Sequence, residues 1–230
     1  MTRSVLFDTE TTGLDPLNGD RVIEVAALEL ENDLPTGKHF HVLVHPERDI
    51  PEEAARVHGI TLDKLAGKPL FAAIVDDLLG FFGDGKLVAH NAAFDFGFLD
   101  AELMRLGRPA LDRARMVDTL ALAKARFPGL PNSLDALCRR FAIDLSERTT
   151  HNALLDCRLL AQVYVELTGG RQRGLSLATA AGGGMPAVSY SAAPRTPRLV
   201  VPTEAELAAH AAFVARLKEP LWTAAPAPGG

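Results

Sequence analysis

Short apolar segments near the N-terminus follow the pattern of β-strands. Residues 4–7, 22–30 and 40–44 are rich in Val, Leu and Phe, and polar, turn-forming stretches separate them. One such stretch surrounds Asn18-Gly19, and another runs from Asn32 to Gly37. Because these joins are short, we expect the three strands to be antiparallel neighbours.

Helical periodicity begins after this region. Apolar residues occupy helical positions over 71–79, a fourth strand is expected at Leu87 to Ala89, and the next helix is expected from Ala92 to Leu106. Asn91 stands where a helix cap is expected, and Gly107 stands where this helix should end.

The remaining residues before 169 complete an α/β pattern. Val117 marks a fifth strand, and helices are predicted over 133–141 and 152–167. Three strands followed by alternating helices and strands predict a mixed five-stranded sheet flanked by helices. We therefore expect one α/β domain over residues 1–168.

The composition changes after this domain. Residues 169–202 are rich in Gly and Pro, which predicts a flexible linker. Thr203 then forms a capping box with Glu206, so a helix is expected from Glu204 to Lys218. This helix has no core of its own, and we interpret 203–230 as a docking helix and tail.

Charge and cysteine content restrict the function classes. The formal net charge of −5 argues against binding a polyanion through Lys and Arg alone, so an acidic nuclease would need metal ions. Cys138 and Cys157 suggest neither a zinc site nor a disulfide framework. The N-terminal apolar segment is too brief for a signal peptide, and no run is long enough to span a membrane. We predict a cytoplasmic protein without a membrane partner.

Candidate chemistry begins in the first strand. Asp8 and Glu10 lie in Phe7-Asp8-Thr9-Glu10-Thr11-Thr12-Gly13, where the alternation of a strand points both carboxylates to one face. Two like charges there would repel each other without a cation. Taken alone, the pair is equally consistent with a polar strand end.

Two further motifs add carboxylates and a histidine. In His90-Asn91-Ala92-Ala93-Phe94-Asp95, Asp95 enters the first turn of a helix, where capping geometry alone would explain it. In His151-Asn152-Ala153-Leu154-Leu155-Asp156, five helical steps would separate the histidine and the aspartate by about 140°. His151 is therefore expected just ahead of the helix and Asp156 inside it. On its own, such a histidine is usually a surface residue.

Together these motifs indicate a site for two hard divalent cations. Four carboxylates arriving from strand ends and helices suit Mg²⁺ or Mn²⁺, which prefer oxygen ligands. Two such ions about 4 Å apart stabilise the attacking and leaving oxygens of a phosphoryl displacement. The negative net charge is compatible with this chemistry.

The motifs resemble those of the DEDD superfamily of 3′→5′ exonucleases, in its histidine-bearing branch, which has the ribonuclease-H-like fold. Residues 4–168 carry the resemblance, which also includes Asn132-Ser133-Leu134-Asp135-Ala136-Leu137-Cys138. Within the branch, the chain is most similar to the proofreading exonucleases of bacterial DNA polymerase III. The resemblance implies removal of nucleotides from the 3′ end of DNA.

The resemblance also implies a role for each charged residue. Asp8, Glu10 and Asp156 would hold one metal ion, Asp8 would bridge to the second, and Asp95 would support the pair. His151 would be the general base, because a neutral imidazole with a reference pKa of about 6.5 can accept a proton from metal-activated water. The sister branch has a tyrosine in place of this histidine.

A further segment, Arg56-Val57-His58-Gly59-Ile60, resembles the part of the family that lines the pocket for the 3′-terminal nucleotide. The residues that the resemblance assigns to substrate binding are Thr9, Thr11, Val57, His58, Asn91 and Phe94. They would grip an unpaired end without regard to its sequence. The alternative is a short helix over 51–57, ended by Gly59, with His58 merely exposed.

The C-terminal region resembles two partner-binding elements. Gln172-Arg173-Gly174-Leu175-Ser176-Leu177 is similar to a sliding-clamp-binding peptide, with Gln172, Leu175 and Leu177 as its anchors; an ordinary linker is the alternative. The helix at 204–218, followed by Leu221 and Trp222, is similar to the region that tethers the family to the polymerase catalytic subunit. The implied partners are the DNA 3′ end, that subunit and the clamp.

Two other functions fit part of the pattern. A free-standing member of the same branch would trim RNA ends or short oligonucleotides, because the same metals hydrolyse both kinds of phosphodiester. A non-catalytic scaffold joining a clamp to a polymerase would require a damaged site. All five expected site residues are present, however: Asp8, Glu10, Asp95, His151 and Asp156.

Overall fold

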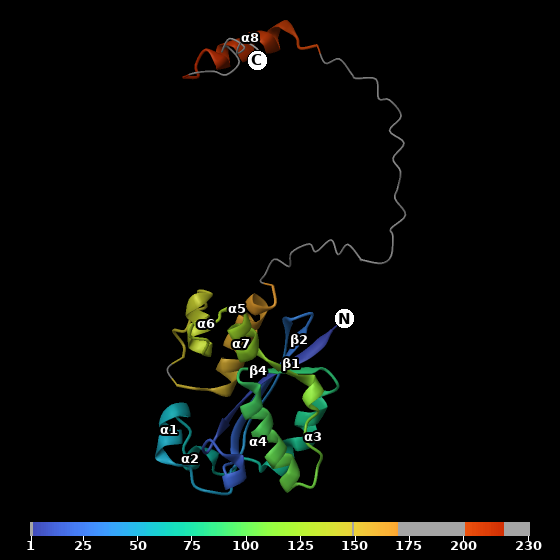
Figure 1. The fold of residues 1–230 in the computed structure, drawn as a ribbon, viewed down its shortest axis with the longest axis vertical. Helices are drawn as coiled ribbons and strands as arrows, with labels where there is room; N and C mark the ends of the chain where they lie inside the picture. The colour runs from blue at the N-terminus through green and yellow to red at the C-terminus, as the bar shows by residue number, and fades with distance from the viewer. Residues whose placement is uncertain (1, 149, 170–200, 219–230) are drawn as a thin grey trace, which may run out of the picture. The chain divides into compact units, whose positions relative to one another are not determined.

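Five strands form a single mixed sheet. The computed structural model describes residues 2–148, 150–169 and 201–218 (Figure 1). The strand order is β3-β2-β1-β4-β5, with β1 antiparallel to β2 and parallel to β4. The strands are β1 (Arg3–Thr11), β2 (Val22–Glu31), β3 (Leu34–Leu43), β4 (Lys86–Ala89) and β5 (Met116–Asp118). The predicted mixed five-stranded sheet is confirmed.

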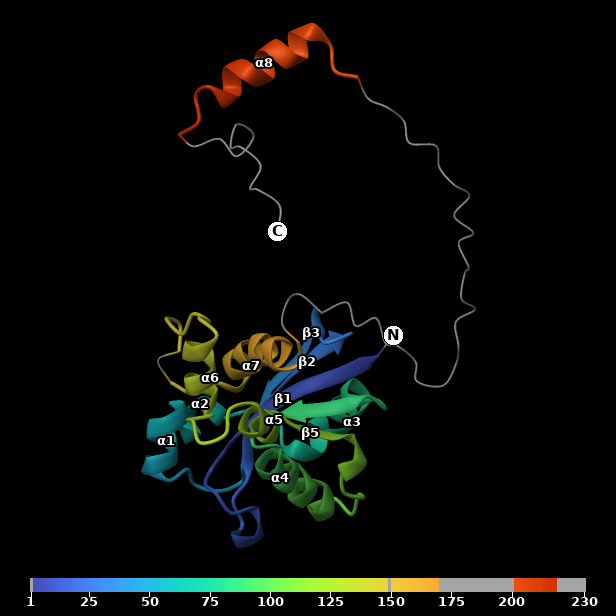
Figure 2. The same cartoon turned by 45° about the horizontal axis from the view of Figure 1, so that its top comes forward.

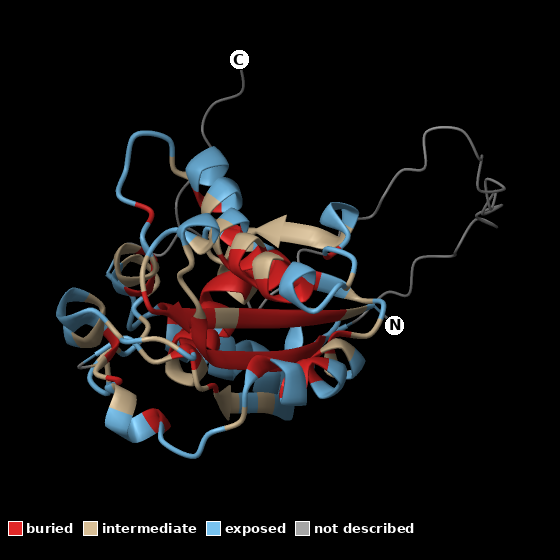
Figure 3. Cartoon of the chain, turned by 90° about the horizontal axis from the view of Figure 1, so that it is seen from below, coloured by how far each residue is buried: buried red, intermediate tan, exposed pale blue. Residues whose placement is uncertain are grey.

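Helices cover both faces of this sheet (Figure 2). Val5 and Phe7 of β1 share one core with α3 (Phe71–Phe82) and α4 (Ala92–Arg105). Leu6, on the opposite face, shares a second core with three further helices. These are α5 (Thr119–Arg126), α6 (Leu134–Arg140) and α7 (Ala153–Leu167). The central strands are therefore buried on both sides (Figure 3).

Short elements occupy the connections between these layers. A 3-10 turn, η1 (Pro16–Asn18), follows β1, and another, η2 (Arg113–Arg115), precedes β5. Between β3 and α3 lie α1 (Glu52–His58) and α2 (Leu62–Leu65).

The hairpin between β2 and β3 is tighter than the sequence predicts. The expected turn ran from Asn32 to Gly37, but β3 already begins at Leu34, which pairs with Glu31. Asn32 and Asp33 have φ values of 51° and 66°. These left-handed conformations suit a two-residue hairpin, and Asn and Asp adopt them more readily than most residues.

The start of α4 also differs from the expectation. Asn91 precedes the helix in a left-handed conformation (φ 65°), and its side chain makes no capping hydrogen bond. Asp118 supplies the cap instead, since its Oδ1 accepts hydrogen bonds from the backbone N–H groups of Asn91 (3.0 Å) and Ala92 (3.3 Å). The same oxygen accepts from Leu120 N at 2.9 Å, so Asp118 also caps α5, a helix that the sequence pattern did not predict. The predicted end of α4 at Gly107 is confirmed within one turn.

A separate unit contains α8 (Glu204–Val214). Thr203 and Glu206 form the predicted capping box, with a Thr203 N to Glu206 Oε2 distance of 2.8 Å. The helix ends at Val214 rather than at the expected Lys218.

Within the described residues, none of the helices has both the length and the apolar character needed to cross a membrane. The predicted clamp-binding anchors and the tail residues lie outside the described residues: Gln172, Leu175, Leu177, Leu221 and Trp222.

Candidate active site

The end of β1 presents side chains to both layers of the fold. Asp8 and Glu10 alternate with Thr9, so the two carboxylates share the face of the strand that carries Leu6. Thr9 points the other way, toward α4, and its backbone N–H and Oγ1 both donate to Asp95 Oδ1, at 3.0 and 2.7 Å. The first and second motifs are thus joined by two hydrogen bonds, and Asp95 is 3% exposed.

The third motif brings His151 and Asp156 together. Asn152 caps α7 by accepting from Leu155 N at 3.0 Å, so the helix begins at Ala153 and His151 lies before it. His151 Nδ1 therefore reaches Asp156 Oδ2, at 3.2 Å, despite the separation of five residues. Asp156 is 4% exposed, whereas the His151 side chain is half exposed.

Glu24 is a functional-site neighbour that sequence reasoning missed. It pairs with Glu10 across β1 and β2 and is 1% exposed. Its Oε2 accepts from Ala153 N at 3.2 Å, and its Oε1 accepts from Asn152 Nδ2 at 3.1 Å and contacts His41 Nε2 at 2.6 Å. Glu24 therefore anchors the start of α7, which carries Asp156. The sequence signal that could have identified Glu24 is the presence of a charged residue within the apolar run 22–30.

Arg148 is the second residue that sequence reasoning missed. Its guanidinium contacts both oxygens of Asp156, at 2.6 and 2.8 Å, and Asp135 Oδ1 at 2.6 Å. It also lies 2.9 Å from His151 Nδ1. The Arg148 side chain is only 9% exposed, so a positive charge is buried beside the carboxylates.

Burial and mutual repulsion alter the acidity of the carboxylates. Burial raises the pKa of Asp8 well above its ordinary value, and the charges of Asp95 and Glu10 raise it further. Burial likewise raises the pKa of Glu10 to about 8 and that of Asp95 to about 7. Burial also acts on Asp156, but hydrogen bonds from Arg148 and His151 outweigh it and lower its pKa. A cation among Asp8, Glu10 and Asp95 would relieve this repulsion.

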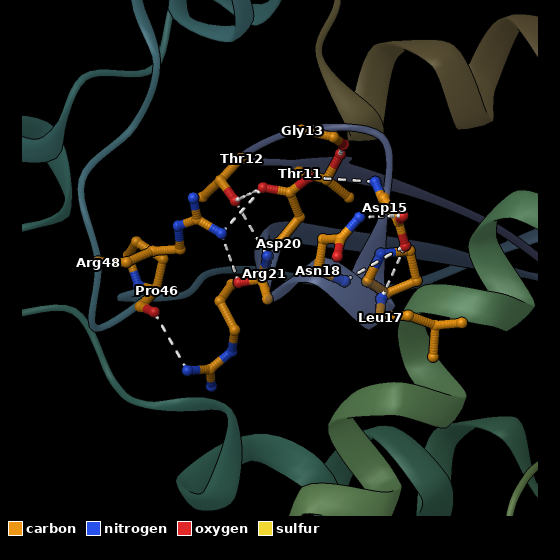
Figure 4. Close-up of polar contacts among 12 residues, drawn as sticks. Thr11, Thr12, Gly13, Asp15, Leu17, Asn18, Asp20, Arg21, Pro46 and Arg48 are labelled. Carbon is orange, nitrogen blue, oxygen red and sulfur yellow. Dashed lines mark hydrogen bonds and ion pairs between the residues drawn. The ribbon is translucent and has the colours of Figure 1, made fainter.

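The loop after β1 is held by the Asp20 carboxylate (Figure 4). Asp20 accepts hydrogen bonds from Thr12 Oγ1 and from the Asp15 backbone N–H, both at 3.1 Å, and it pairs with Arg48 at 3.0 Å. A Cβ atom on Gly13 would overlap this carboxylate. The first motif therefore ends in glycine because Asp20 packs directly against it.

One cavity of about 540 Å³ collects most of the predicted site residues. The predicted residues that line it are Asp8, Thr9, Glu10, Thr11, Val57, His58, Phe94, Asp95, His151 and Asp156. Asn91 lines a second hollow instead, which shares Asp8, His90, His151 and Asp156 with the first. The three motifs and the segment at Val57 thus converge on one place.

His58 is buried and lines the cavity. It ends α1, where Gly59 (φ 70°) closes the helix, but it is 5% exposed, so the alternative of a merely exposed histidine is wrong. Its Nδ1 accepts from Ile60 N at 3.0 Å. Burial lowers the pKa of His58, so the neutral ring carries its proton on Nε2. Within the described part of the chain, this buried Nε2 makes no hydrogen bond of good geometry, and the Thr11 backbone is the polar group beside the ring.

The donor set around Asp156 suits a metal ion. Glu10, His151 and Asp156 each offer a ligand atom, and these atoms lie within 4.8 Å of one another. The site therefore combines a carboxylate and histidine group able to hold a metal with a cavity beside it.

Comparison with known proteins places this site in a family. A family model described as Exonuclease (RNase_T) matches residues 5–164. The DNA polymerase III subunit epsilon of Rickettsia felis is 51% identical over 173 residues, 74% of this chain and 76% of that protein. The epsilon subunit of Rickettsia conorii is 45% identical over 226 residues, 94% of this chain and 96% of the relative. That of Escherichia coli K12 is 45% identical over 178 residues, 74% and 73% of the two chains.

Solved structures agree with this assignment. Exonuclease X in complex with 5′ overhanging duplex DNA has a TM-score of 0.58 at 26% identity and covers 74% of this chain and 92% of its own. The nuclease domain of 3′hExo, a DEDDh family member bound to rAMP, has a TM-score of 0.62 at 17% identity and covers 72% and 91%, which shows the shared fold.

The chain therefore belongs to the exonuclease family that includes the epsilon subunits of DNA polymerase III. The predictions of a ribonuclease-H-like fold and of a 3′→5′ exonuclease related to the proofreading subunits are confirmed.

Proposed function

We propose that this exonuclease proofreads for a bacterial replicative DNA polymerase by hydrolysing the terminal phosphodiester at the 3′ end of DNA, with two divalent cations and His151 as general base. One observation carries the proposal: four acidic residues and His151 line the same cavity as Val57, His58 and Phe94. The proposed metal ligands and general base therefore lie beside a hollow large enough for a nucleotide.

The acidic residues fit a pair of hard divalent cations. Glu10, Asp95 and Asp156 are buried and Asp8 is half-buried, and carboxylate oxygens are the preferred ligands of Mg²⁺ and Mn²⁺. The pKa values of Asp8, Glu10 and Asp95 are raised, mainly by burial. Asp8, Glu10 and Asp156 would hold one ion, Asp8 would also contact the second, and Asp95 would support the pair. When bound, such ions activate water and stabilise charge on the phosphate oxygens.

His151 has the position of a general base. Its half-exposed ring lies at the rim of the cavity, and Asp156 contacts Nδ1 at 3.2 Å. The hydrogen bond to Asp156 raises the pKa of His151. A ring whose Nδ1–H donates to Asp156 has a free lone pair on Nε2, and this atom would accept the proton of the attacking water.

The opposite side of the cavity would hold the terminal nucleotide. The buried Nε2–H of His58 would donate to an oxygen of the sugar or base, and such a partner would satisfy a donor that otherwise makes no hydrogen bond of good geometry. Val57, half exposed, and the ring of Phe94 supply apolar contact, with Thr9 and Thr11 near the terminal hydroxyl. Asn91 would contact the preceding nucleotide from the second hollow. None of these contacts depends on base identity, as proofreading requires.

The proposed partners are the catalytic subunit of DNA polymerase III and the sliding clamp, in the cytoplasm. Support comes from the similarity to the Rickettsia conorii epsilon subunit, which extends over 94% of this chain and so includes much of the C-terminal region. Co-purification with the polymerase subunit should be lost when the chain is truncated after Gly170. Clamp binding should be lost in the double variant Leu175→Ala with Leu177→Ala, whereas co-purification with the polymerase subunit should survive that change.

The base assignment is tested by His151→Ala, with His39→Ala on the exposed face of β3 as the matched control. We expect His151→Ala to retain metal and DNA binding and to lose on the order of 10² to 10⁴ in kcat, while the control stays near the native value. Turnover near normal in His151→Ala would remove this residue from the mechanism. Faster release from RNA than from DNA of equal length would favour an RNA-trimming enzyme instead.

A further inference from the structure

Arg148 contacts both Asp156, a proposed metal ligand, and His151, the proposed general base. It comes from the connection between α6 and α7, three residues before His151. Its nearly buried guanidinium spans both Asp156 oxygens and Asp135 Oδ1. A planar guanidinium with several N–H donors is well suited to hold two carboxylates at once.

This contact conflicts with the use of Asp156 as a metal ligand. The ligand atoms of Glu10, His151 and Asp156 lie within 4.8 Å of one another, so an ion bound among them needs an oxygen of Asp156. Both oxygens already accept hydrogen bonds from Arg148, at 2.6 and 2.8 Å. A metal ion and this guanidinium therefore compete for the same carboxylate oxygens, and because both are positively charged they also repel each other.

A second conflict exists at His151. Its Nδ1 lies 2.9 Å from an Arg148 nitrogen and 3.2 Å from Asp156 Oδ2. Arg148 can only donate, so its contact with Nδ1 favours a ring whose proton lies on Nε2, whereas the contact with Asp156 favours a proton on Nδ1. In the form that Arg148 favours, neither ring nitrogen can accept a proton from water. Once Arg148 moves away, Nδ1–H can donate to Asp156 and the Nε2 lone pair becomes free.

We propose that Arg148 is a positioning residue, an internal counter-cation that holds Asp156 and His151 in the metal-free enzyme and releases both when a divalent cation binds. Asp135 is the group that retains Arg148 during this exchange, because it contacts Arg148 at 2.6 Å and is itself partly exposed. The inference rests on the proposed metal-dependent function. Because Arg148 restrains both Asp156 and His151, binding of the metal ion to Asp156 would also free His151 to act as the base.

The competition is tested by calorimetric titration of Mn²⁺ into the full chain, which requires no turnover. Arg148→Gln should bind Mn²⁺ on the order of tenfold more tightly than the native chain, because the competing charged hydrogen bonds to Asp156 are gone. The matched control is Arg139→Gln, which removes an exposed arginine that contacts Asp135 at 3.6 Å. We expect the control to change the affinity by less than about threefold, because exposed charges are screened.

The outcomes separate the inference from its alternatives. Damage to the fold would weaken metal binding, so tighter binding in Arg148→Gln alone supports the competition. Equal tightening in Arg148→Gln and Arg139→Gln would show a general charge effect and overturn it, as would unchanged or weaker binding in Arg148→Gln. If Arg148→Gln does not fold, Arg148→Lys, which keeps the charge but loses the two-point contact, must bind Mn²⁺ at least about threefold more tightly. Failure of the native chain to bind Mn²⁺ would count against the proposed function itself.

Discussion

Replacing Glu10 by glutamine should stabilise the metal-free enzyme at alkaline pH while abolishing its activity. Glu10 is 9% exposed and faces Glu24 across β1 and β2. Burial raises its pKa from 4.5 to about 8. The folded state therefore binds this proton more tightly than the unfolded chain does. The resulting stabilisation is fully present below about pH 4.5 and is lost as the pH rises through about 8.

The size of the effect follows from the two pKa values. One pKa unit corresponds to about 1.36 kcal/mol, so a rise from 4.5 to about 8 sets an upper limit of roughly 5 kcal/mol. Between about pH 5 and pH 9, the native chain without metal should lose roughly 4 kcal/mol of unfolding free energy through this group. Glutamine has no charge to bury, so Glu10→Gln should lose less stability than the native chain by about this amount, while the contributions of Asp8 and Asp95 remain.

The assay is urea unfolding in chelator across this pH range. Glu31→Gln, at the exposed end of β2, is the matched control and should follow the native chain. Added Mn²⁺ should restore stability to the native chain at high pH and do little for Glu10→Gln. Parallel pH profiles for the native chain and Glu10→Gln would refute the reasoning, because the charge on Glu10 would then carry no energetic cost in the fold.

Two further substitutions probe the surroundings of the acidic cluster. Gly13→Ala should lower the unfolding free energy by about 1–3 kcal/mol, because its Cβ would displace the Asp20 carboxylate. Gly97→Ala, which meets nothing within 4 Å, should show no such loss in the same urea experiment. Phe94→Ala should raise the KM for a single-stranded primer by about tenfold and change kcat by less than about threefold, since its ring lines the nucleotide cavity. A fall confined to kcat in steady-state assays would instead place Phe94 in the chemical step.

The proposed metal ligands could be picked out from the sequence because each lies in a short motif whose local structure is fixed by local rules. Strand alternation places Asp8 and Glu10 on one face, and the start of a helix carries Asp95 and Asp156 inward. The separation of His151 from Asp156 was also informative, since it requires the histidine to lie before the helix.

The supporting residues were not predictable because their partners are distant in the chain. Glu24 accepts a hydrogen bond from the backbone N–H of Ala153, which is 129 residues away in the sequence. Asp118 accepts one from the backbone N–H of Asn91, which is 27 residues away. In the sequence, Glu24 interrupts an apolar strand and Asn91 occupies an ordinary cap position, so local rules pointed to the wrong cap. Arg148 stands in a polar connection and gains its role only when Asp135 and Asp156 are brought beside it.

The central claim is most directly tested by release of mononucleotides from a 3′-mismatched DNA primer, measured for the native chain, Asp8→Ala and Asp84→Ala. Asp8 would contact both metal ions, whereas Asp84 is an exposed residue outside the cavity. With Mg²⁺ or Mn²⁺, the native chain and Asp84→Ala should release nucleotides from the 3′ end. Asp8→Ala should release none, and chelator should stop release by the native chain and by Asp84→Ala. Metal-dependent release by Asp8→Ala at a rate near that of the native chain, or release by the native chain in chelator, would contradict the two-metal account.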